Sequence, residues 1–373
     1  MVRKAKSDSL SKKAYKFRIY PSEEQKIFFA KTFGCTRFIY NQMLADKISY
    51  YKKTKGMLHN TPAQYKEKYL WLKEVDSLAL TNAQKNLETA YDNFFKNTKI
   101  GFPKFKAKRK TKKAYTTNNV NDNIKIVNNY LKIPKIKSLI KIKIHRNIPD
   151  NYKLKSVTIS QSASGKYFAS VCVEETIKPK ESTGTAIGID LGLKEYLTTS
   201  NNEVVQNPKW LRNSEEKLKK LQRSHSRKKK GSKNREKARL KLAKQYEKVT
   251  NQRRYFQQVL STKLINENQV ICLETLKSSN MVKNHKIAKS IQDVSWYEFV
   301  RQLEYKGLWN DRNIIKIDQF YPSSQICSCC GEKNIKTKDL NYRVYECDSC
   351  GLVIDRDYNA SVNILNEGLR IIE

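Results

Sequence analysis

Alternation of apolar and polar side chains predicts strands in the first half of the chain. Residues 14–20 alternate, as expected for a strand with one buried face. Residues 156–162 and 166–174 alternate on either side of Ser164-Gly165-Lys166, a pattern typical of a β-hairpin. The whole stretch 120–178 is strand-like, and several short strands so close together favour a small barrel.

Apolar side chains at helical spacing predict helices between and after these strands. Ser22 can cap a helix and Gln25 completes a capping box, so a helical region opens after Pro21 and continues to about residue 95. Its large apolar side chains are interpreted as core: Phe28, Phe29, Phe33, Phe38, Tyr40, Leu87, Ala90, Tyr91, Phe94 and Phe95. Residues 207–265 form a second helical region, which Gly231-Ser232 divides into a hairpin of two helices.

In the second half, short apolar segments carry acids at their edges. Asp190 interrupts the apolar strand within residues 186–200, Glu274 directly follows the strand 269–273, and Asp357 begins the last helical segment. Burying a carboxylate among apolar residues is costly unless a cation or a hydrogen-bond donor compensates it. Taken singly, such an acid is more often a turn residue or an ion-pair partner.

Three such acids can converge only if a sheet brings their elements together. An amphipathic helix around residues 296–303 and a further strand at 313–317 supply the remaining elements of such a sheet. Convergent carboxylates repel one another unless divalent cations bind between them, and Mg²⁺ or Mn²⁺ prefers oxygen ligands. Two such ions about 4 Å apart activate a water and stabilise the leaving oxygen in phosphodiester hydrolysis.

The charge of the chain indicates a polyanionic partner. Its 373 residues include 74 basic and 36 acidic side chains, a net charge of +38, which repels itself unless a polyanion neutralises it. Nucleic acid is the natural partner, and a membrane surface or a ribosome is the alternative. No apolar run approaches the roughly 18 residues of a membrane span, and the charged N-terminus is not a signal peptide, so we expect a cytoplasmic protein that is nucleoid-associated when it is bound to DNA.

Two segments concentrate this charge. Residues 101–113 carry seven basic residues and no acid, and residues 212–254 carry 18 basic and 4 acidic residues. A solvated linker and a solvated helix tip are the simpler interpretations, but unopposed charges beside Phe102 and Phe105 suit a phosphate backbone. The candidate contacts are Lys104, Lys106, Lys108, Arg109, Arg227, Lys228, Lys229 and Lys230.

Two Cys-x-x-Cys pairs predict one structural zinc site. Cys327 and Cys330 are separated from Cys347 and Cys350 by sixteen residues, the spacing of a four-thiolate zinc ribbon. A glycine follows each second cysteine, as a tight turn toward the sulfurs requires, and this register leaves Cys329 outside the site. The other cysteines, Cys35, Cys172 and Cys272, lie singly among apolar neighbours and are expected in the core. This arrangement indicates a reducing compartment.

The sequence around these residues resembles the RuvC-like nuclease motifs of the TnpB family. The matching segments are GIDLGLKEYLTTS, the acid of ICLETLKSSNM, SSQICSCCG and DRDYNASVNIL. Further similarity in YKFRIYPSEEQ, in LETAYDNFFK with GFPKFK, and in the basic helical segment extends over almost the whole chain. TnpB proteins are compact RNA-guided endonucleases of bacterial insertion sequences, related to type V CRISPR effectors and traditionally labelled transposase or OrfB.

The resemblance implies specific roles for several residues. The catalytic triad falls on Asp190, Glu274 and Asp357, and Asp357 is preferred to Asp355 because Asn359-Ala360 follows it at the family's spacing. Supporting roles fall on Asp355, Arg356 and Asn359, and zinc on the four cysteines named above. Asn82 and Gln84 align loosely with side chains that read a target-adjacent motif, or else face solvent on a helix. Gln257-Gln258 departs from the histidine of many relatives.

The implied fold is an α+β multidomain protein. Residues 1–20 and 115–180 would form an oligonucleotide-binding-like β-barrel wedge domain, with a helical recognition domain at 21–114 inserted. Residues 183–324 and 353–373 would form an RNase H-like (RuvC) nuclease domain with a basic helical insertion at 207–265, and residues 325–352 the zinc ribbon. The implied partners are a guide RNA from the element's end and double-stranded target DNA, and no membrane. The implied cofactors are two catalytic Mg²⁺ or Mn²⁺ ions and one Zn²⁺. The protein would be a monomer bound to its RNA.

Other functions stay open on the sequence alone. A non-cleaving, RNA-guided DNA-binding regulator could use the same scaffold, although all three acids are present. A transposase that joins strands, or an accessory protein of one, is disfavoured because no tyrosine or serine recombinase motif is evident. A ribosomal RNA-binding protein would explain the charge but not three placed acids.

Overall fold

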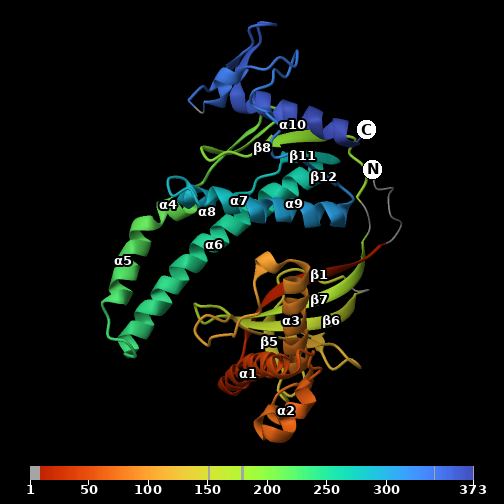
Figure 1. Cartoon of the computed structure of the whole chain (residues 1–373), viewed down its shortest axis with the longest axis vertical. Coiled ribbons are helices and arrows are strands. Elements are labelled where there is room, and N and C mark those ends of the chain that lie inside the picture. The colour runs from red at the N-terminus through yellow and green to blue at the C-terminus, as the bar shows by residue number, and fades with distance from the viewer. Residues whose placement is uncertain (1–8, 150–151, 178–179, 340, 373) are drawn as a thin grey trace. The chain divides into compact units, whose positions relative to one another are not determined.

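The computed structural model describes residues 9–149, 152–177, 180–339 and 341–372, which divide into two compact units (Figure 1). Leu10–Thr176 forms one unit, and the chain from Ile177 onward builds the other. Each unit has its own hydrophobic cores. Within the described ranges, no helix is both long and apolar enough to cross a membrane.

The first unit is built on one seven-stranded sheet in the order β2-β6-β7-β1-β5-β4-β3. Apolar residues on alternate positions, such as Phe17 and Ile19, are fully buried, as the alternation predicts. The hairpin at Gly165 is confirmed, since Gly165 has a φ of 84° in the turn between β6 and β7, which pair antiparallel. Closure of the sheet into a barrel stays a prediction. The strands are β1 Ser9–Tyr20, β2 Lys113–Asn118, β3 Lys125–Val127, β4 Tyr130–Lys132, β5 Ile140–Lys143, β6 Lys153–Gln161 and β7 Tyr167–Ile177.

Helices α1 (Glu23–Thr54), α2 (Pro62–Lys68) and α3 (Ser77–Lys96) complete this unit. The predicted capping box at the start of α1 is present, since the Ser22 side chain accepts from the Gln25 N–H and the Gln25 side chain accepts from the Ser22 N–H. Most predicted core residues of α1 and α3 are buried or partly buried. The core interpretation of Phe95 is wrong, because its side chain is 64% exposed.

The second unit contains a five-stranded sheet in the order β10-β9-β8-β11-β12. Strands β8 (Ala186–Asp190), β11 (Val270–Glu274) and β12 (Asn313–Ile317) run parallel, and β9 (Glu195–Thr199) and β10 (Val204–Gln206) continue the sheet antiparallel. The central strands are nearly continuous apolar runs, as is usual for a parallel sheet that is buried on both faces.

Helices cover both faces of this sheet (Figure 1). Helices α6 (Lys233–Glu267) and α9 (Trp296–Asn310) pack their apolar residues against Ile189 and Ile271. On the opposite face, helix α10 (Arg356–Ile372) packs Ile364 against Cys272. The sheet is therefore the middle layer of three.

Two glycines allow α10 to lie unusually close to the sheet. A Cβ atom on Gly188 in β8 would lie 2.1 Å from the Ser361 backbone oxygen, and one on Gly368 in α10 would lie 2.2 Å from the Cys272 sulfur. Neither position has room for a larger residue. Of the isolated cysteines, Cys272 and Cys35 are buried as predicted, whereas Cys172 is only half-buried.

The predicted helical hairpin is confirmed as α5 (Glu215–Ser226) followed by α6. Gly231 adopts a φ of 85° in the connection, and Ser232 caps α6 by accepting from the Arg235 N–H at 3.1 Å. The base of the hairpin is surrounded by three short helices, α4 (Trp210–Asn213), α7 (Ser278–Met281) and α8 (Ala288–Val294). Just before α10, strand β13 (Val344–Glu346) pairs antiparallel with β14 (Val353–Asp355).

Candidate active site and metal centre

The three predicted acids gather at one edge of the five-stranded sheet. Asp190 is the last residue of β8 and Glu274 is the last residue of β11. Because these two strands are parallel neighbours, their carboxyl ends meet at the same edge. Asp357 lies in the first turn of α10, which packs across both strands. Residues more than 160 positions apart in sequence are thus brought together by the parallel pairing and the close-packed helix.

The surroundings of Asp190 and Glu274 oppose their ionisation. Burial raises the pKa of Asp190 well above its ordinary value, the negative charges of Glu274 and Asp357 raise it further, and Arg356 partly offsets the rise. Burial also raises the pKa of Glu274. Among the described side chains, no lysine or arginine forms an ion pair with Asp190 or Glu274. Two buried carboxylates of this kind do not both ionise readily unless a positive charge lies between them.

Asp357 and Asp355 have different surroundings. The Asp357 carboxylate pairs with Arg356 at 3.1 Å and with Arg343 at 3.5 Å. The Asp355 carboxylate accepts the backbone N–H groups of Asp357 and Tyr358, both at 2.9 Å. Asp355 therefore caps the N-terminus of α10, while Asp357 is the acid that interacts with Asp190.

Hydrogen bonds connect the acids to the cysteine-rich loops. Ser323 donates its hydroxyl to Glu274. The fully buried Asn359 donates to the Ile326 backbone oxygen and accepts from the Ser328 N–H. Asn363, one helical turn later, donates to the backbone oxygens of Ser323 and Ile326. Sequence reasoning missed Ser323 and Asn363, although the spacing of four between Asn359 and Asn363 places both on one helix face.

The four predicted cysteines form a metal-binding cluster. Their sulfur atoms all lie within 4.8 Å of one another, with Cys327 and Cys350 3.6 Å apart and Cys330 and Cys347 3.5 Å apart. Both turns have the same geometry, since Gly331 and Gly351 have φ values of 81° and 73° and donate to the Cys327 and Cys347 backbone oxygens. Four thiolates fit a tetrahedral Zn²⁺. Cys329 is exposed and lies outside the cluster.

The thiol of Cys347 is already biased toward the thiolate. The backbone N–H groups of Cys350 and Ser349 lower the pKa of Cys347 to about 7. Within the described part of the chain, the four cysteines are the one group of three or more possible metal ligands whose ligand atoms all lie within 4.8 Å of one another. The carboxylate oxygens of the three acids are therefore farther apart than the four sulfur atoms. The oxygen atoms of the acids nevertheless have the chemistry that Mg²⁺ and Mn²⁺ prefer.

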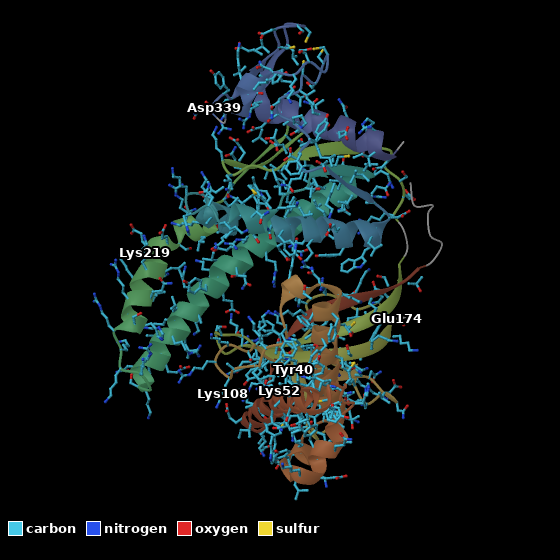
Figure 2. The ribbon with its side chains drawn as sticks, in the orientation of Figure 1. Tyr40, Lys52, Lys108, Glu174, Lys219 and Asp339 are labelled. Carbon is cyan, nitrogen blue, oxygen red and sulfur yellow. The ribbon has the colours of Figure 1, made fainter. Side chains whose placement is uncertain are left out.

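The predicted nucleic-acid contacts differ in their availability. Lys104, Lys108 and Arg109 are exposed, whereas the Lys106 ammonium lies 3.6 Å from the centre of the Tyr40 ring and burial lowers its pKa. Figure 2 marks Tyr40 and Lys108. Asn41 fixes this segment by exchanging two hydrogen bonds with the Lys106 backbone. Lys106 is therefore an anchor of the segment and not a free cation.

The remaining predicted contacts lie on helices or at the tip of the helical hairpin. Arg227, Lys229 and Lys230 are exposed between α5 and α6, and Lys228 is half-buried. Asn82 donates to Leu78, Thr116 and Asn118, which joins α3 to β2. Gln84 donates to Glu88 on its own helix. Gln257, where the sequence departs from many relatives, is buried and donates to Tyr196 and Val294.

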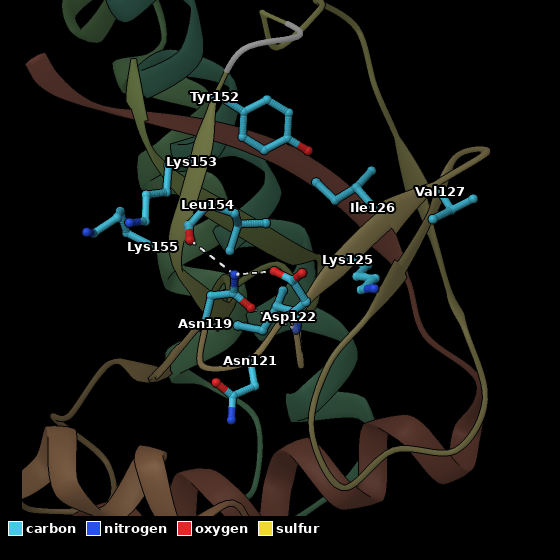
Figure 3. A pocket seen from close by; sticks show the side chains of 11 residues that line it. Asn119, Asn121, Asp122, Lys125, Ile126, Val127, Tyr152, Lys153, Leu154 and Lys155 are labelled. Carbon is cyan, nitrogen blue, oxygen red and sulfur yellow. Dashed lines mark hydrogen bonds between the residues drawn. The ribbon is translucent and has the colours of Figure 1, made fainter. Parts of the chain in front are cut away.

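A cavity of about 700 Å³ lies in the first unit, away from the acids in sequence and in topology (Figure 3). Asn119 donates there to the Leu154 backbone oxygen at 3.2 Å and to Asp122 at 3.5 Å. Asp122 is the one acidic residue that lines this cavity, and no histidine or cysteine lines it. The cavity therefore has no evident catalytic group.

Comparisons with known proteins agree with this arrangement. The sequence model of a family described as "Probable transposase" matches residues 170–285, that of a "Cas12f1-like, TNB domain" matches residues 296–364, and that of a helix-turn-helix domain matches residues 11–56. In the last range the structure has strand β1 and the single helix α1.

Two similar proteins span nearly the whole chain. A protein of Streptomyces pristinaespiralis, provisionally named as an RNA-guided DNA endonuclease, is 38% identical over 96% of this chain and 90% of its own length. InsQ of Escherichia coli K12, with the same provisional name, is 29% identical over 96% of this chain and 93% of its own length. The TnpB-like protein L79 of Acanthamoeba polyphaga mimivirus is 30% identical over 58% of this chain and 44% of its own length.

A solved structure has the same fold. The Cas12f1 protein of a Cas12f1-sgRNA-target DNA complex aligns with a TM-score of 0.60, covering 96% of this chain and 99% of its own. The sequences are 16% identical, so the likeness concerns the fold alone.

Proposed function

Because the chain belongs to the TnpB family, we propose that it is an RNA-guided, metal-dependent DNA endonuclease encoded by a bacterial insertion sequence. It binds a guide RNA from its element's end and cleaves double-stranded DNA beside a short target-adjacent motif. The observation that carries this proposal is the gathering of Asp190, Glu274 and Asp357 at one sheet edge, where the first two have no basic partner among the described side chains.

Asp190, Glu274 and Asp357 would hold two Mg²⁺ or Mn²⁺ ions. When bound, such ions activate the attacking water and stabilise the leaving oxygen of the phosphodiester. Arg356 and Arg343 hold the Asp357 carboxylate in place, and Asp355 fixes the start of its helix.

A Zn²⁺ held by the four cysteines would act at a distance from the chemistry. The first cysteine turn is bonded to Asn359 and Asn363 of α10, and α10 carries Asp357. Ser323, just before the first cysteine pair, orients Glu274. The zinc ribbon, residues 325–352, is therefore a brace for two of the three acids.

The basic surfaces would bind the RNA and the guide–target heteroduplex. The hairpin of α5 and α6 is fixed at its base by the buried Asp293, which accepts the Leu211 and Arg212 N–H groups and pairs with Arg253. Its tip carries the exposed cations Arg227, Lys229 and Lys230, whereas Lys219, labelled in Figure 2, lies near the start of α5 and pairs with Glu215. Contacts to phosphates position a nucleic acid without reading its sequence, while base pairing to a guide supplies specificity.

The first unit would supply the remaining parts of such an enzyme. We assign residues 1–20 and 115–180 to a wedge domain and residues 21–114 to a recognition domain. Lys104, Lys108 and Arg109 are its candidate phosphate contacts, because they are exposed on a segment that Asn41 holds in place. A non-cleaving regulator is disfavoured, because such a protein would have no need for three acids held at one edge.

The test is to purify the protein with its co-purifying RNA, to sequence that RNA, and to incubate the complex with DNA that matches it. Mg²⁺-dependent cuts in the matching DNA, and none in a scrambled target, are expected. Tight binding of the matching DNA without cleavage in Mg²⁺ or Mn²⁺ would favour the regulator.

A further inference from the structure

The loop Asp318–Ser323 follows the third parallel strand at the edge where the acids lie. In the sheet order, β8 ends at Asp190, β11 at Glu274, and the adjacent β12 at Ile317. Glu274 is paired in register with Ile317. The loop therefore begins beside one acid, and its last residue, Ser323, donates a hydrogen bond to that same acid.

The loop is held in one conformation by bonds along its length. The Asp318 carboxylate accepts the Phe320 N–H at 2.7 Å, and the Tyr321 backbone oxygen accepts the Ser323 N–H at 2.9 Å. The Ser323 backbone oxygen accepts from Asn363 of α10 at 2.8 Å. Tyr321 packs against the core beneath α10.

Phe320 points away from this core. Its side chain is 80% exposed, although the aromatic ring of its neighbour Tyr321 is partly buried. A single exposed apolar residue is ordinary on a protein surface. Here, however, the ring lies on a loop that begins directly after Ile317, the register partner of Glu274, and ends at Ser323, which donates to Glu274. The loop itself contains no lysine or arginine, and Lys316 just before it pairs with Glu304.

We propose that Phe320 stacks on a base of the DNA strand held at the three acids and so positions the scissile phosphate. This inference rests on the proposed function. When a guide pairs with one DNA strand, the other strand is displaced and its bases expose their flat faces. Stacking of such bases on an aromatic ring is tolerant of sequence. Such tolerance suits an enzyme in which pairing to a guide reads the sequence.

The test compares substitutions of Phe320 by other side chains. Phe320→Leu keeps an apolar side chain without a flat ring, Phe320→Trp keeps the ring, and Phe320→Ala removes both. Tyr297→Ala is the matched control, because Tyr297 is 75% exposed and lies on α9, which packs on the face of the sheet opposite α10. These residues are exposed, so folding and zinc content are expected to stay unchanged.

We expect the single-turnover cleavage rate to fall by about tenfold or more in Phe320→Ala and Phe320→Leu, and to stay within about threefold of the wild type in Phe320→Trp and Tyr297→Ala. A second readout needs no cleavage. In an Asp190→Ala background, target DNA carries the fluorescent base 2-aminopurine beside the mapped cut. Its fluorescence should be quenched when residue 320 is Phe or Trp, because the base stacks on the ring, and should be brighter when residue 320 is Ala or Leu.

Wild-type cleavage and unchanged 2-aminopurine fluorescence in Phe320→Ala would overturn the inference, and so would full activity of Phe320→Leu. Failure of the proposed function is a different result, because the wild type itself would then cleave no matching target. In that case, 2-aminopurine scanned along a single-stranded oligonucleotide still decides whether Phe320 stacks, and an absence of quenching at every position would overturn the inference.

Discussion

Asn359 donates its side-chain amide to the backbone oxygen of Ile326 at 2.7 Å, which joins the helix of Asp357 to the first cysteine turn. The same side chain accepts the Ser328 N–H at 2.9 Å, so it holds the backbone on both sides of Cys327. Asn359 is fully buried and only two residues from Asp357. One side chain thus couples the metal-binding loop to a candidate catalytic acid.

Asn359→Ala should therefore weaken both stability and cleavage. The substitution leaves the Ser328 N–H without its partner and removes one of the two donors to the Ile326 oxygen, which Asn363 still contacts. We expect a cost of roughly 1–3 kcal/mol in the free energy of unfolding. Zinc content should persist when Zn²⁺ is in excess, because no cysteine is lost. Urea denaturation, metal analysis and a cleavage assay measure the three effects, and a variant with wild-type stability and rate would show that the coupling is unimportant.

One cysteine inside the cluster and one outside it make a direct test of the zinc register. Cys350→Ser should lose the bound zinc, because it removes one of four thiolates that lie within 4.8 Å of one another. Cys329→Ser should retain it, because Cys329 is exposed and outside this cluster. Metal analysis of the two purified variants measures the difference. Equal zinc content in both would refute the register.

Gly188→Ala tests the close packing of α10 on the sheet. The new Cβ would lie 2.1 Å from the Ser361 backbone oxygen and 2.7 Å from the Leu365 nitrogen, so the helix must shift. We expect a loss of roughly 1–3 kcal/mol in the free energy of unfolding and a loss of cleavage, because α10 carries Asp357. Gly34→Ala in α1 is the control. Its Cβ would meet nothing within 4 Å, so that variant should be as stable as the wild type or more stable by about 0.5–1 kcal/mol.

Lys306 should make stability depend on pH in the alkaline range. Its ammonium is buried and donates to Gln258, Ser261 and Thr262, with no carboxylate among these partners. Burial lowers the pKa of Lys306 to about 8. Between about pH 8 and the unfolded-state pKa near 10.4, the unfolded chain binds a proton that the folded chain has released, so stability rises with pH in this window.

Lys306→Met removes this proton linkage. We expect the unfolding free energy of the wild type to rise relative to that of the variant, by roughly 2–3 kcal/mol between pH 7.5 and pH 10.5. Urea denaturation of RNA-free protein at several pH values measures the difference. Lys241→Met, at an exposed position of α6, should run parallel to the wild type. Parallel curves for Lys306→Met as well would show that Lys306 does not release its proton in the folded state.

Much of the second unit could be predicted from local patterns. Asp190 and Glu274 were found because each closes an apolar run, and parallel strands place such ends at one edge. The cysteine register followed from spacing and two glycines. The roles of Ser323 and Asn363 could not be predicted in this way, because their partners are set by tertiary packing and not by periodicity.

In the first unit, two residues lie in surroundings that the sequence pattern did not indicate. Lys106 is one of seven cations within residues 101–113. Its ammonium nevertheless faces the Tyr40 ring, because Asn41 bonds both the N–H and the carbonyl of Lys106 and so fixes its backbone. Phe95 belongs to an apolar helical stripe, yet it lies in the last turn of α3 and is exposed. The spacing of apolar residues along the sequence does not show which helix or strand covers them, or where that helix or strand ends.

The most direct test of the account is the Mg²⁺-dependent cleavage rate of four alanine variants, measured on RNA-loaded protein with matching DNA. Asp190→Ala, Glu274→Ala and Asp357→Ala should each lose cleavage almost completely and still bind the target, because each removes a ligand from a shared two-ion site. Asp355→Ala should keep measurable cleavage and lose about 1 kcal/mol of stability, because Asp355 caps α10. Cleavage at nearly the wild-type rate by any of the first three variants, or a dead Asp355→Ala beside an active Asp357→Ala, would contradict the assignment.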